Sequence, residues 1–157
     1  MFRDWISLRV NDDDILHEQM DPKSSRTEHD FKLYVMDLSY FSGKLEMYFR
    51  YKELKYQRLE PTCKQLADIV ARETGCEQAP QVFDQRTHVP DNQRWLRDTT
   101  YIIEHLENDT DISKDNLSIM PACPVQLFFH RLLEDYADEY LWRPAMWWRW
   151  VKRSSYF

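Results

Sequence analysis

Cysteine is scarce in this sequence of 157 residues, and its three copies, Cys63, Cys76 and Cys123, lie far apart. They form no CxxC pair and no spacing that is typical of a metal site. The sequence therefore predicts neither a disulfide framework nor a bound metal. An odd number of isolated cysteines is instead typical of reduced thiols, which indicates the cytoplasm.

Long apolar runs and an excess of positive charge are lacking as well. No stretch approaches the roughly 18 apolar residues that a membrane-spanning helix needs. Residues 1–14 carry an early charge and no apolar segment long enough for a signal peptide. A formal net charge of −6 argues against a surface for nucleic acid or anionic membrane. We therefore expect a cytoplasmic protein with no nucleic-acid partner and no membrane partner.

Residues 1–30 differ from the rest of the chain, because the stretches at 11–14 and 21–30 are rich in charge and poor in apolar residues. This composition is typical of a disordered extension, since too little apolar surface is available to offset the entropy lost on folding. A short apolar cluster around Trp5 offers an alternative, in which the segment binds a partner. The folded part of the chain is expected to begin after residue 30.

Residues 32–60 predict a strand, a turn, an amphipathic helix and a second strand. Apolar, β-branched and aromatic residues at 32–38 favour the first strand. The hydroxyl side chains from Ser39 to Ser42 favour a helix cap, and apolar residues recur at near-helical spacing from Lys44 onward. The N-terminus of such a helix presents free backbone N–H groups and therefore favours an anion. An ordinary structural crossover is the alternative interpretation.

The chain after residue 60 predicts a second helix, a hairpin of two short strands and a third helix. Thr62 can cap the second helix, and Gly75 can end it in a left-handed conformation. Pro80 stands at the entrance of the next strand, because proline cannot donate a hydrogen bond within a sheet. Asp98 is suited to start the third helix, and a purely structural cap is the alternative to a functional role.

The C-terminal part of the sequence predicts a polar linker at 109–124 and a longer helix from residue 125 with an apolar face. Pro144 is expected to kink or break this helix, since proline removes a backbone hydrogen bond and its ring clashes with the preceding turn. Residues 146–150, MWWRW, carry more aromatic area than a single helix can hide. We therefore expect this aromatic segment to need a partner surface.

The predicted order of elements is βαβαββα with a proline at the start of the third strand, which describes the thioredoxin-like α/β fold. At this point the sequence resembles a glutathione S-transferase. The resemblance rests on LSYFSGKL at 38–45, on Gln78-Ala79-Pro80, on Asp98-Thr99 and on LEDYADEYLWRPAM at 133–146, in the family's order. It implies a thioredoxin-like glutathione-binding domain at 31–108 and, at 125–157, the first helix of a truncated all-helical domain.

The same resemblance implies roles for individual residues. The segment at 38–45 is similar to the family's S-x-x-S/C-x-K/R, so Ser39 is expected to face the sulfur of glutathione, with Tyr40 and then Ser42 as alternatives. A hydroxyl at a helix N-terminus stabilises a bound thiolate. Because Ser39 is not a cysteine, thiol–disulfide exchange is disfavoured. The residues expected to bind glutathione are Gln78, Ala79, Pro80, Asp98 and Thr99.

Each of these binding residues has a physical reason for its place. A cis Ala79–Pro80 bond turns the chain and leaves the backbone groups of Ala79 for a bound tripeptide, which adds to the sheet as an extra strand. The Asp98 carboxylate matches the ammonium of the γ-glutamyl group, and Thr99, with the helix N-terminus, matches its carboxylate. Glutathione is thus expected as the substrate, and no metal is implied.

Two features depart from the family pattern. Ala79 replaces the usual Val or Ile before the proline, and the sequence ends when the second domain of the family has barely started. Two functions are therefore predicted: a glutathione transferase that conjugates glutathione to a small electrophile, or a non-catalytic module that binds glutathione or another protein. The truncated end also suggests association, for example as a homodimer.

Overall fold

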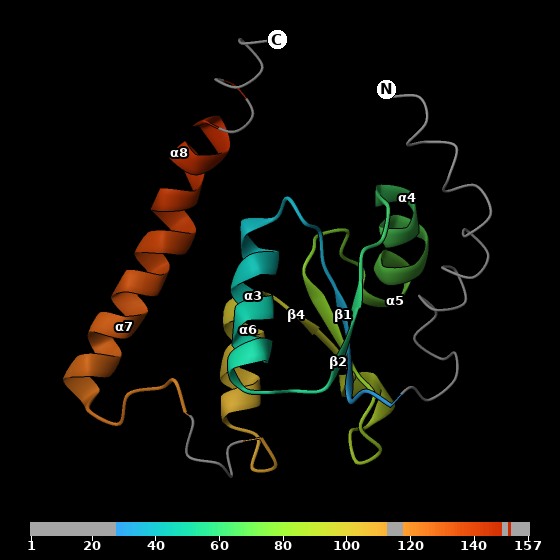
Figure 1. Ribbon diagram of the computed structural model, residues 1–157, viewed down its shortest axis with the longest axis horizontal. Coiled ribbons are helices and arrows are strands. Elements are labelled where there is room, and N and C mark those ends of the chain that lie inside the picture. The colour runs from blue at the N-terminus through green and yellow to red at the C-terminus, as the bar shows by residue number, and fades with distance from the viewer. Residues whose placement is uncertain (1–27, 113–117, 149–150, 152–157) are drawn as a thin grey trace. The chain divides into compact units, whose positions relative to one another are not determined.

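The structure is a computed structural model that describes residues 28–112, 118–148 and 151. These residues divide into two units, one that ends at Leu106 and one that starts at Glu107. The first unit contains a sheet with helices on both faces, and the second is dominated by one long helical segment (Figure 1). Most of the expected N-terminal extension at 1–30 lies outside the described residues.

The first unit is built on a sheet of four strands in the order β2-β1-β3-β4. Strand β1 is parallel to β2 and antiparallel to β3, and β3 is antiparallel to β4. All residues of the central strand β1 are buried, as expected for a strand with helices over both faces of its sheet. This arrangement confirms the thioredoxin-like α/β fold. The strands are β1 (Phe31–Tyr34), β2 (Tyr56–Leu59), β3 (Gln81–Asp84) and β4 (Trp95–Arg97).

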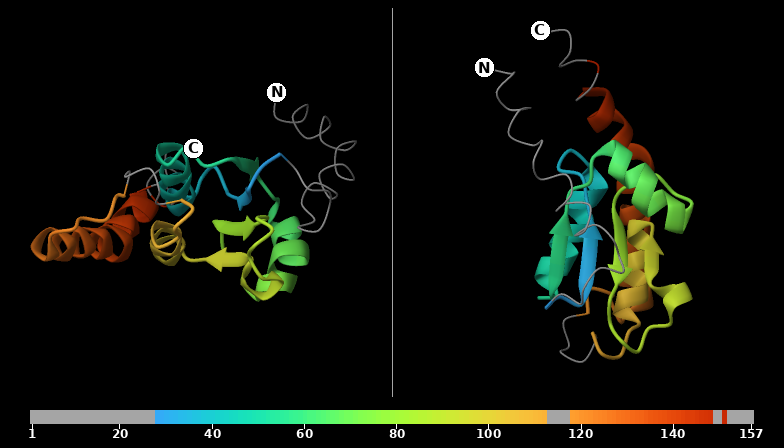
Figure 2. Two further views of the ribbon diagram at one scale, coloured as in Figure 1. Left: turned by 90° about the horizontal axis from the view of Figure 1, so that it is seen from below. Right: turned by 90° about the vertical axis from the view of Figure 1, so that its right-hand side faces the viewer.

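Helices α3 (Tyr40–Tyr51) and α6 (Thr99–Glu107) lie on one face of the sheet (Figures 1 and 2). Phe49 of α3 packs edge to face on Phe31 of β1, with ring centroids 5.4 Å apart. The other face carries α4 (Cys63–Gln65) and α5 (Ala71–Thr74), joined by a π-helical turn. The core on this side contains Tyr34, Leu59, Leu66, Val70 and Phe83.

The two helix ends expected around the second helix are confirmed. Thr62 accepts a hydrogen bond from the backbone N–H of Gln65, whose side chain in turn accepts one from the N–H of Thr62. This reciprocal pair satisfies two N–H groups that the helix itself leaves free. Gly75 ends α5 with a φ of 69°, in the left-handed region that glycine adopts without steric cost.

The boundaries expected for the first strand and helix were wrong by several residues. Strand β1 ends at Tyr34 rather than at residue 38, and α3 begins at Tyr40 rather than at Lys44. The residues between them form a turn, in which the backbone N–H of Ser39 donates to the carbonyl of Met36 at 2.9 Å. Contacts from α3 and β2 hold this turn. The strand prediction was wrong because it relied on the apolar character of residues 35–38 alone.

The second unit contains α7 (Pro124–Tyr136), a π-helical turn (Ala137–Leu141) and α8 (Trp142–Trp147), which continue one another. Of the expected kink or break at Pro144, the break is therefore wrong, because α8 continues through this residue. The wider π-turn directly before α8 relieves the clash between a proline ring and the preceding turn. None of the helices in the described part of the chain is long and apolar enough to cross a membrane.

The apolar side chains of this long helical segment are exposed. No residue of α7 or α8 is buried, although an amphipathic helix normally packs its apolar face. Trp147 and Trp148 from the expected aromatic segment are exposed too, whereas Trp150 lies outside the described residues. The large apolar side chains of α7 that are exposed are those of Val125, Phe128, Phe129, Leu132, Leu133 and Tyr136, and we call them the α7 face.

Candidate functional site

The strand register brings three of the four predicted motifs, those that contain Ser39, Pro80 and Asp98, to one end of the sheet. Tyr34, the last residue of β1, pairs with Gln81, the first residue of β3. Gln81 also pairs with Arg97, the last residue of β4. Ser39 follows β1 by a short turn, Pro80 directly precedes β3, and Asp98 directly follows β4. Segments far apart in the sequence therefore meet at one edge, which is the candidate functional site.

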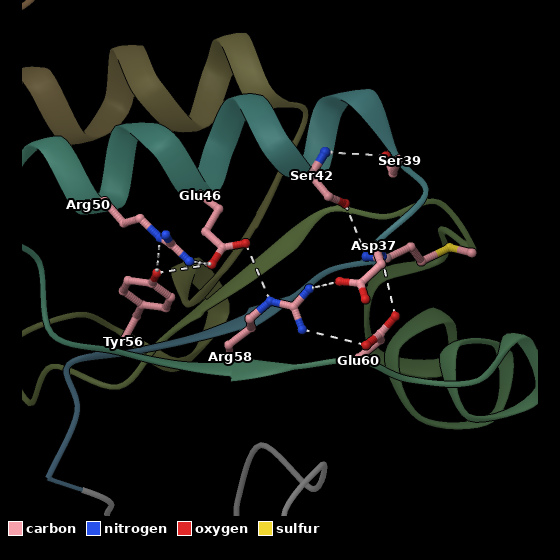
Figure 3. A network of polar contacts seen from close by, with 9 residues as sticks. Asp37, Ser39, Ser42, Glu46, Arg50, Tyr56, Arg58 and Glu60 are labelled. Carbon is pink, nitrogen blue, oxygen red and sulfur yellow. Dashed lines mark hydrogen bonds and ion pairs between the residues drawn. The ribbon is translucent and has the colours of Figure 1, made fainter. Parts of the chain in front are cut away.

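Ser39 is the N-cap residue of α3. Its Oγ accepts a hydrogen bond from the backbone N–H of Ser42 at 3.2 Å (Figure 3). A hydroxyl that accepts one bond keeps its own proton to donate. The side chain is only partly buried, and it lies at the positive end of the α3 dipole. Ser39 can therefore donate to an anionic atom placed beyond the helix end.

The two alternatives to Ser39 lie in different surroundings. Ser42 is buried, and its Oγ accepts a hydrogen bond from the backbone N–H of Met36 at 3.1 Å, so its hydroxyl holds the turn before α3. Tyr40 is the first residue of α3 and is 45% exposed. Its ring packs edge to face on Phe41 at 5.4 Å between centroids. Of these two, Tyr40 is the one that a ligand can reach from solvent.

The Ala79–Pro80 peptide bond is cis, as expected. Pro80 is buried and Ala79 is partly buried against the core, whereas Gln78 is exposed. The turn before Pro80 is held from within the sheet, because Nε2 of Gln81 donates to the carbonyls of Cys76 at 2.7 Å and Gln78 at 2.8 Å. This brace by Gln81 has no local sequence signal, since it depends on the path of the turn.

Asp98 caps α6 with an unusual backbone conformation. Its Oδ1 accepts hydrogen bonds from the backbone N–H groups of Thr100 at 3.0 Å and Tyr101 at 3.2 Å. Its φ of 69° lies in the left-handed region, which costs energy for a residue other than glycine. The carboxylate is exposed, so it can still accept from a ligand. Thr99, the first residue of α6, is only 6% exposed.

A network of charged residues that the sequence analysis missed adjoins the turn at Ser39 (Figure 3). Arg58 of β2 pairs with Asp37 of the turn, with Glu46 of α3 and with Glu60. Glu46 also pairs with Arg50 at 2.7 Å. The Glu46–Arg50 pair has the i,i+4 spacing of one helix face. The links from Arg58 to Asp37 and to Glu46 depend on the fold, because these three residues come from separate elements.

The electrostatics of this network favour the ionised carboxylate of Glu46. Burial raises the pKa of the Glu46 carboxyl, but hydrogen bonds and charges from Arg50 and Arg58 outweigh this effect, so its pKa lies below the ordinary value of 4.5. Burial lowers the pKa of Arg58, but Asp37 and Glu46 more than compensate and raise it. Both groups are therefore charged at neutral pH.

Metal ligands do not gather in the described part of the chain. No group of three or more His, Cys, Asp or Glu side chains is placed there to hold a metal ion. The cysteines Cys63, Cys76 and Cys123 are free thiols. The arrangement at the sheet end is thus one of hydroxyl, carboxylate and backbone groups, which suits a small peptide-like ligand with charged ends.

Neither a family model nor a curated protein matches the sequence. Solved structures do match the fold. A Tau class glutathione S-transferase from mango, Mangifera indica, is 21% identical with a TM-score of 0.59, and the match covers 73% of this chain and 48% of that one. An Omega-class glutathione transferase from Trametes versicolor is 15% identical with a TM-score of 0.58, covering 79% and 53%.

A third match is a glutathione S-transferase from Methylobacillus flagellatus with glutathione bound, 20% identical with a TM-score of 0.51, covering 69% of this chain and 48% of that one. The chain thus spans about half the length of the solved structures that it matches. At these identities the likeness establishes the fold. The chain has the fold of the glutathione S-transferases, as its motifs indicated.

Proposed function

We propose that this chain binds glutathione at the candidate site and activates its thiol for attack on a small electrophile. The observation that carries the proposal is the convergence of Ser39, the cis Ala79–Pro80 bond and Asp98 at one end of the sheet. The structural neighbour from Methylobacillus flagellatus, which contains glutathione, supports the choice of ligand.

Glutathione binding is assigned to the residues around the cis-proline and the start of α6. The backbone N–H and C=O of Ala79 pair with the tripeptide as an added strand, and the exposed side chain of Gln78 contacts it from the same turn. The exposed carboxylate of Asp98 binds the γ-glutamyl ammonium. The backbone N–H of Thr99, at the N-terminus of α6, binds the γ-glutamyl carboxylate.

Activation of the thiol is assigned to Ser39. The thiol loses its proton to solvent, and the hydroxyl of Ser39 donates a hydrogen bond to the resulting thiolate, which the dipole of α3 also stabilises. The thiolate sulfur then forms a bond to the electrophilic atom of the substrate, and the leaving group departs with the electron pair of the broken bond. No enzyme-bound covalent intermediate is needed, and we place the reaction in the cytoplasm.

A second candidate function is a module that binds glutathione or a protein without turnover. The exposed α7 face favours it, because large exposed apolar patches are typical of interaction surfaces. A second copy of the chain, as a homodimer, is one partner that would cover such a face.

Two measurements separate the candidates. Retention of the chain on immobilised glutathione tests binding, and conjugation of a chloro-dinitroaromatic compound tests turnover. Retention with conjugation supports the transferase, and retention without conjugation selects the binding module. A chain that passes through the immobilised glutathione without delay contradicts glutathione binding in either form.

The role of Ser39 is tested by substitution. Ser39→Ala should leave glutathione affinity nearly unchanged, because the affinity is assigned to Asp98 and Ala79. It should raise the pKa of the bound thiol toward its free value of about 8.5. Tyr40→Phe is the matched control. If Tyr40→Phe raises the thiol pKa and Ser39→Ala does not, Tyr40 is the activating residue.

A further inference from the structure

The turn that carries Ser39 is held from both of its sides. On the helix side, Oγ of Ser42 accepts a hydrogen bond from the N–H of Met36 at 3.1 Å. On the strand side, Oε1 of Glu60 accepts one from the N–H of Asp37 at 3.3 Å. The backbone N–H of Ser39 donates to the carbonyl of Met36 at 2.9 Å. The position of the Ser39 hydroxyl therefore depends on contacts from α3 and from the end of β2.

Arg58 contacts the turn and residues on both of its sides (Figure 3). Its Nη2 pairs with the carboxylate of Asp37, its Nη1 lies 3.5 Å from Oε2 of Glu60, and its Nε lies 3.3 Å from Oε2 of Glu46. The three nitrogens of the planar guanidinium thus face three different carboxylates, which a lysine ammonium could not match in geometry. Arg58 links the turn before Ser39 to the helix after it.

Arg58 offsets the repulsion between the carboxylates of the cluster. Three carboxylates, those of Asp37, Glu46 and Glu60, converge on this one guanidinium. Without it, their mutual repulsion would favour an arrangement that separates them. Asp37 is the carboxylate best able to move, because its side chain is 65% exposed and it lies in a turn. Displacement of Asp37 would shift Ser39, two residues further along the chain.

We propose that Arg58 is a positioning residue for the Ser39 hydroxyl and acts through Asp37. The inference rests on the proposed function, in which Ser39 donates to the thiolate of glutathione. Arg58 touches neither glutathione nor the reacting atoms in this proposal. It sets the hydroxyl in the direction from which it reaches the sulfur.

The rival explanation is that the positive charge of the guanidinium acts directly on the thiolate. The sign of the thiol pKa shift in one variant separates the two explanations. Removing the positive charge of Arg58 raises the thiol pKa under either explanation. Removing the negative charge of Asp37 lowers the thiol pKa if fields alone act, because a negative charge disfavours a nearby thiolate. If positioning acts, Asp37→Asn instead raises the thiol pKa, because the amide keeps an acceptor oxygen but loses the ion pair, which weakens the link between the turn and Arg58.

The experiment uses the full chain and measures two quantities. The pKa of the bound glutathione thiol is titrated by thiolate absorbance, and glutathione affinity is measured by calorimetry. The variants are Arg58→Gln, Arg58→Lys and Asp37→Asn. Arg50→Gln is the matched control, because it removes the same charge from the same network, but the side chain of Arg50 bonds Glu46 and Tyr56 rather than the turn.

Positioning predicts that Arg58→Gln and Asp37→Asn each raise the thiol pKa by about half a unit or more, with affinity changed less than about twofold. Arg58→Lys should raise it by a smaller amount, and Arg50→Gln should leave it unchanged. In the double variant of Arg58 and Asp37 the two shifts should not add, because both act through one contact.

Each contrary result has a separate meaning. A lower thiol pKa in Asp37→Asn, or an equal rise in Arg50→Gln, overturns positioning and leaves the proposed function standing. A wild-type chain that does not bind glutathione overturns the proposed function and this inference together. If Arg58→Gln fails to fold, the sign of the shift in Asp37→Asn decides alone, since that side chain is largely exposed.

Discussion

Helices α3 and α7 are of similar length and both amphipathic, yet their apolar side chains end in opposite surroundings. In α3, Leu45, Tyr48 and Phe49 are buried against the sheet. In α7, no residue is buried. The contrast extends to the two units, because every buried apolar side chain of the described residues lies between Phe31 and Leu106.

The difference teaches what an amphipathic pattern does and does not specify. The pattern states that one face of a helix favours burial, but it does not name the surface that buries it. For α3 that surface is the sheet that the same segment of chain forms before and after the helix. Within its own unit no residue of α7 is buried, and large exposed apolar faces are typical of interaction surfaces.

The largest expected effect tests burial directly. Phe49→Ala should lower the free energy of unfolding by about 3–5 kcal/mol, because Phe49 is 0% exposed and its removal leaves a cavity. Phe128→Ala, at a side chain that is 62% exposed, should lower it by less than about 0.5 kcal/mol. Urea denaturation of both variants checks this pair. A similar loss for Phe128→Ala would mean that the α7 face is covered in solution.

The next effect concerns where glutathione binds. Asp98→Asn should weaken binding about tenfold or more, because the amide keeps a capping oxygen for α6 but loses the charge that attracts the ligand ammonium. Phe128→Ser in α7 should leave binding unchanged. Calorimetric titration with glutathione measures both. Equal affinity of Asp98→Asn and wild type would remove Asp98 from the site, and a loss in Phe128→Ser would extend the site into the second unit.

A smaller difference separates exposed thiols in the two units. The backbone N–H groups of Gln126 and Val125, at the start of α7, favour the thiolate of Cys123 and lower the pKa of its thiol. Cys123 should therefore react with iodoacetamide about threefold faster than the exposed Cys63 at neutral pH. The rate advantage of Cys123 should shrink as the pH rises, because a lowered thiol pKa increases the thiolate fraction less in alkaline solution. Peptide mass spectrometry reports both rates, and equal rates at neutral pH would contradict the prediction.

The smallest effect is a pH dependence of the first unit. The pKa of Glu46 is lower in the folded chain than its ordinary 4.5, so its stabilising contribution is complete above that value and disappears as the pH falls through the lowered pKa. Glu46→Gln should thus cost about 0.5–1 kcal/mol near neutral pH and progressively less in acid. Urea denaturation of the variant and the wild type, near neutral pH and in acid, measures this difference in the free energy of unfolding. A cost that does not change with pH would exclude the ion pairs as its source.

Local signals in the sequence predicted the parts of the fold that depend on local chemistry. The cap at Thr62 and the left-handed Gly75 were predicted correctly, because each acts on backbone groups within a few residues. The candidate site was assembled from Ser39, Pro80 and Asp98 because their segments resemble motifs of one family. Each residue sits at the end of a strand or helix, and the order of elements brings those ends together.

The features that the sequence did not predict depend on contacts between distant segments. The end of β1 and the start of α3 are set by the buried Ser42 and by Arg58 and Glu60, which belong to other elements. The helix that continues through Pro144 depends on a π-turn, and no residue type specifies such a turn. The ion pairs of Arg58 beside Ser39 could not be predicted from the sequence for the same reason, because they join distant segments.

The backbone at Asp98 also limits how the sequence can vary. A φ of 69° is adopted most readily by Gly, Asn and Asp. Glycine would fit the backbone and lose the cap, and asparagine would fit both but carry no charge. Few residue types therefore suit this position for folding and, under the proposed function, only aspartate suits it for binding. Random variants that are selected only for stability should accept Asn or Gly at position 98, whereas variants that are selected for glutathione binding should retain Asp98.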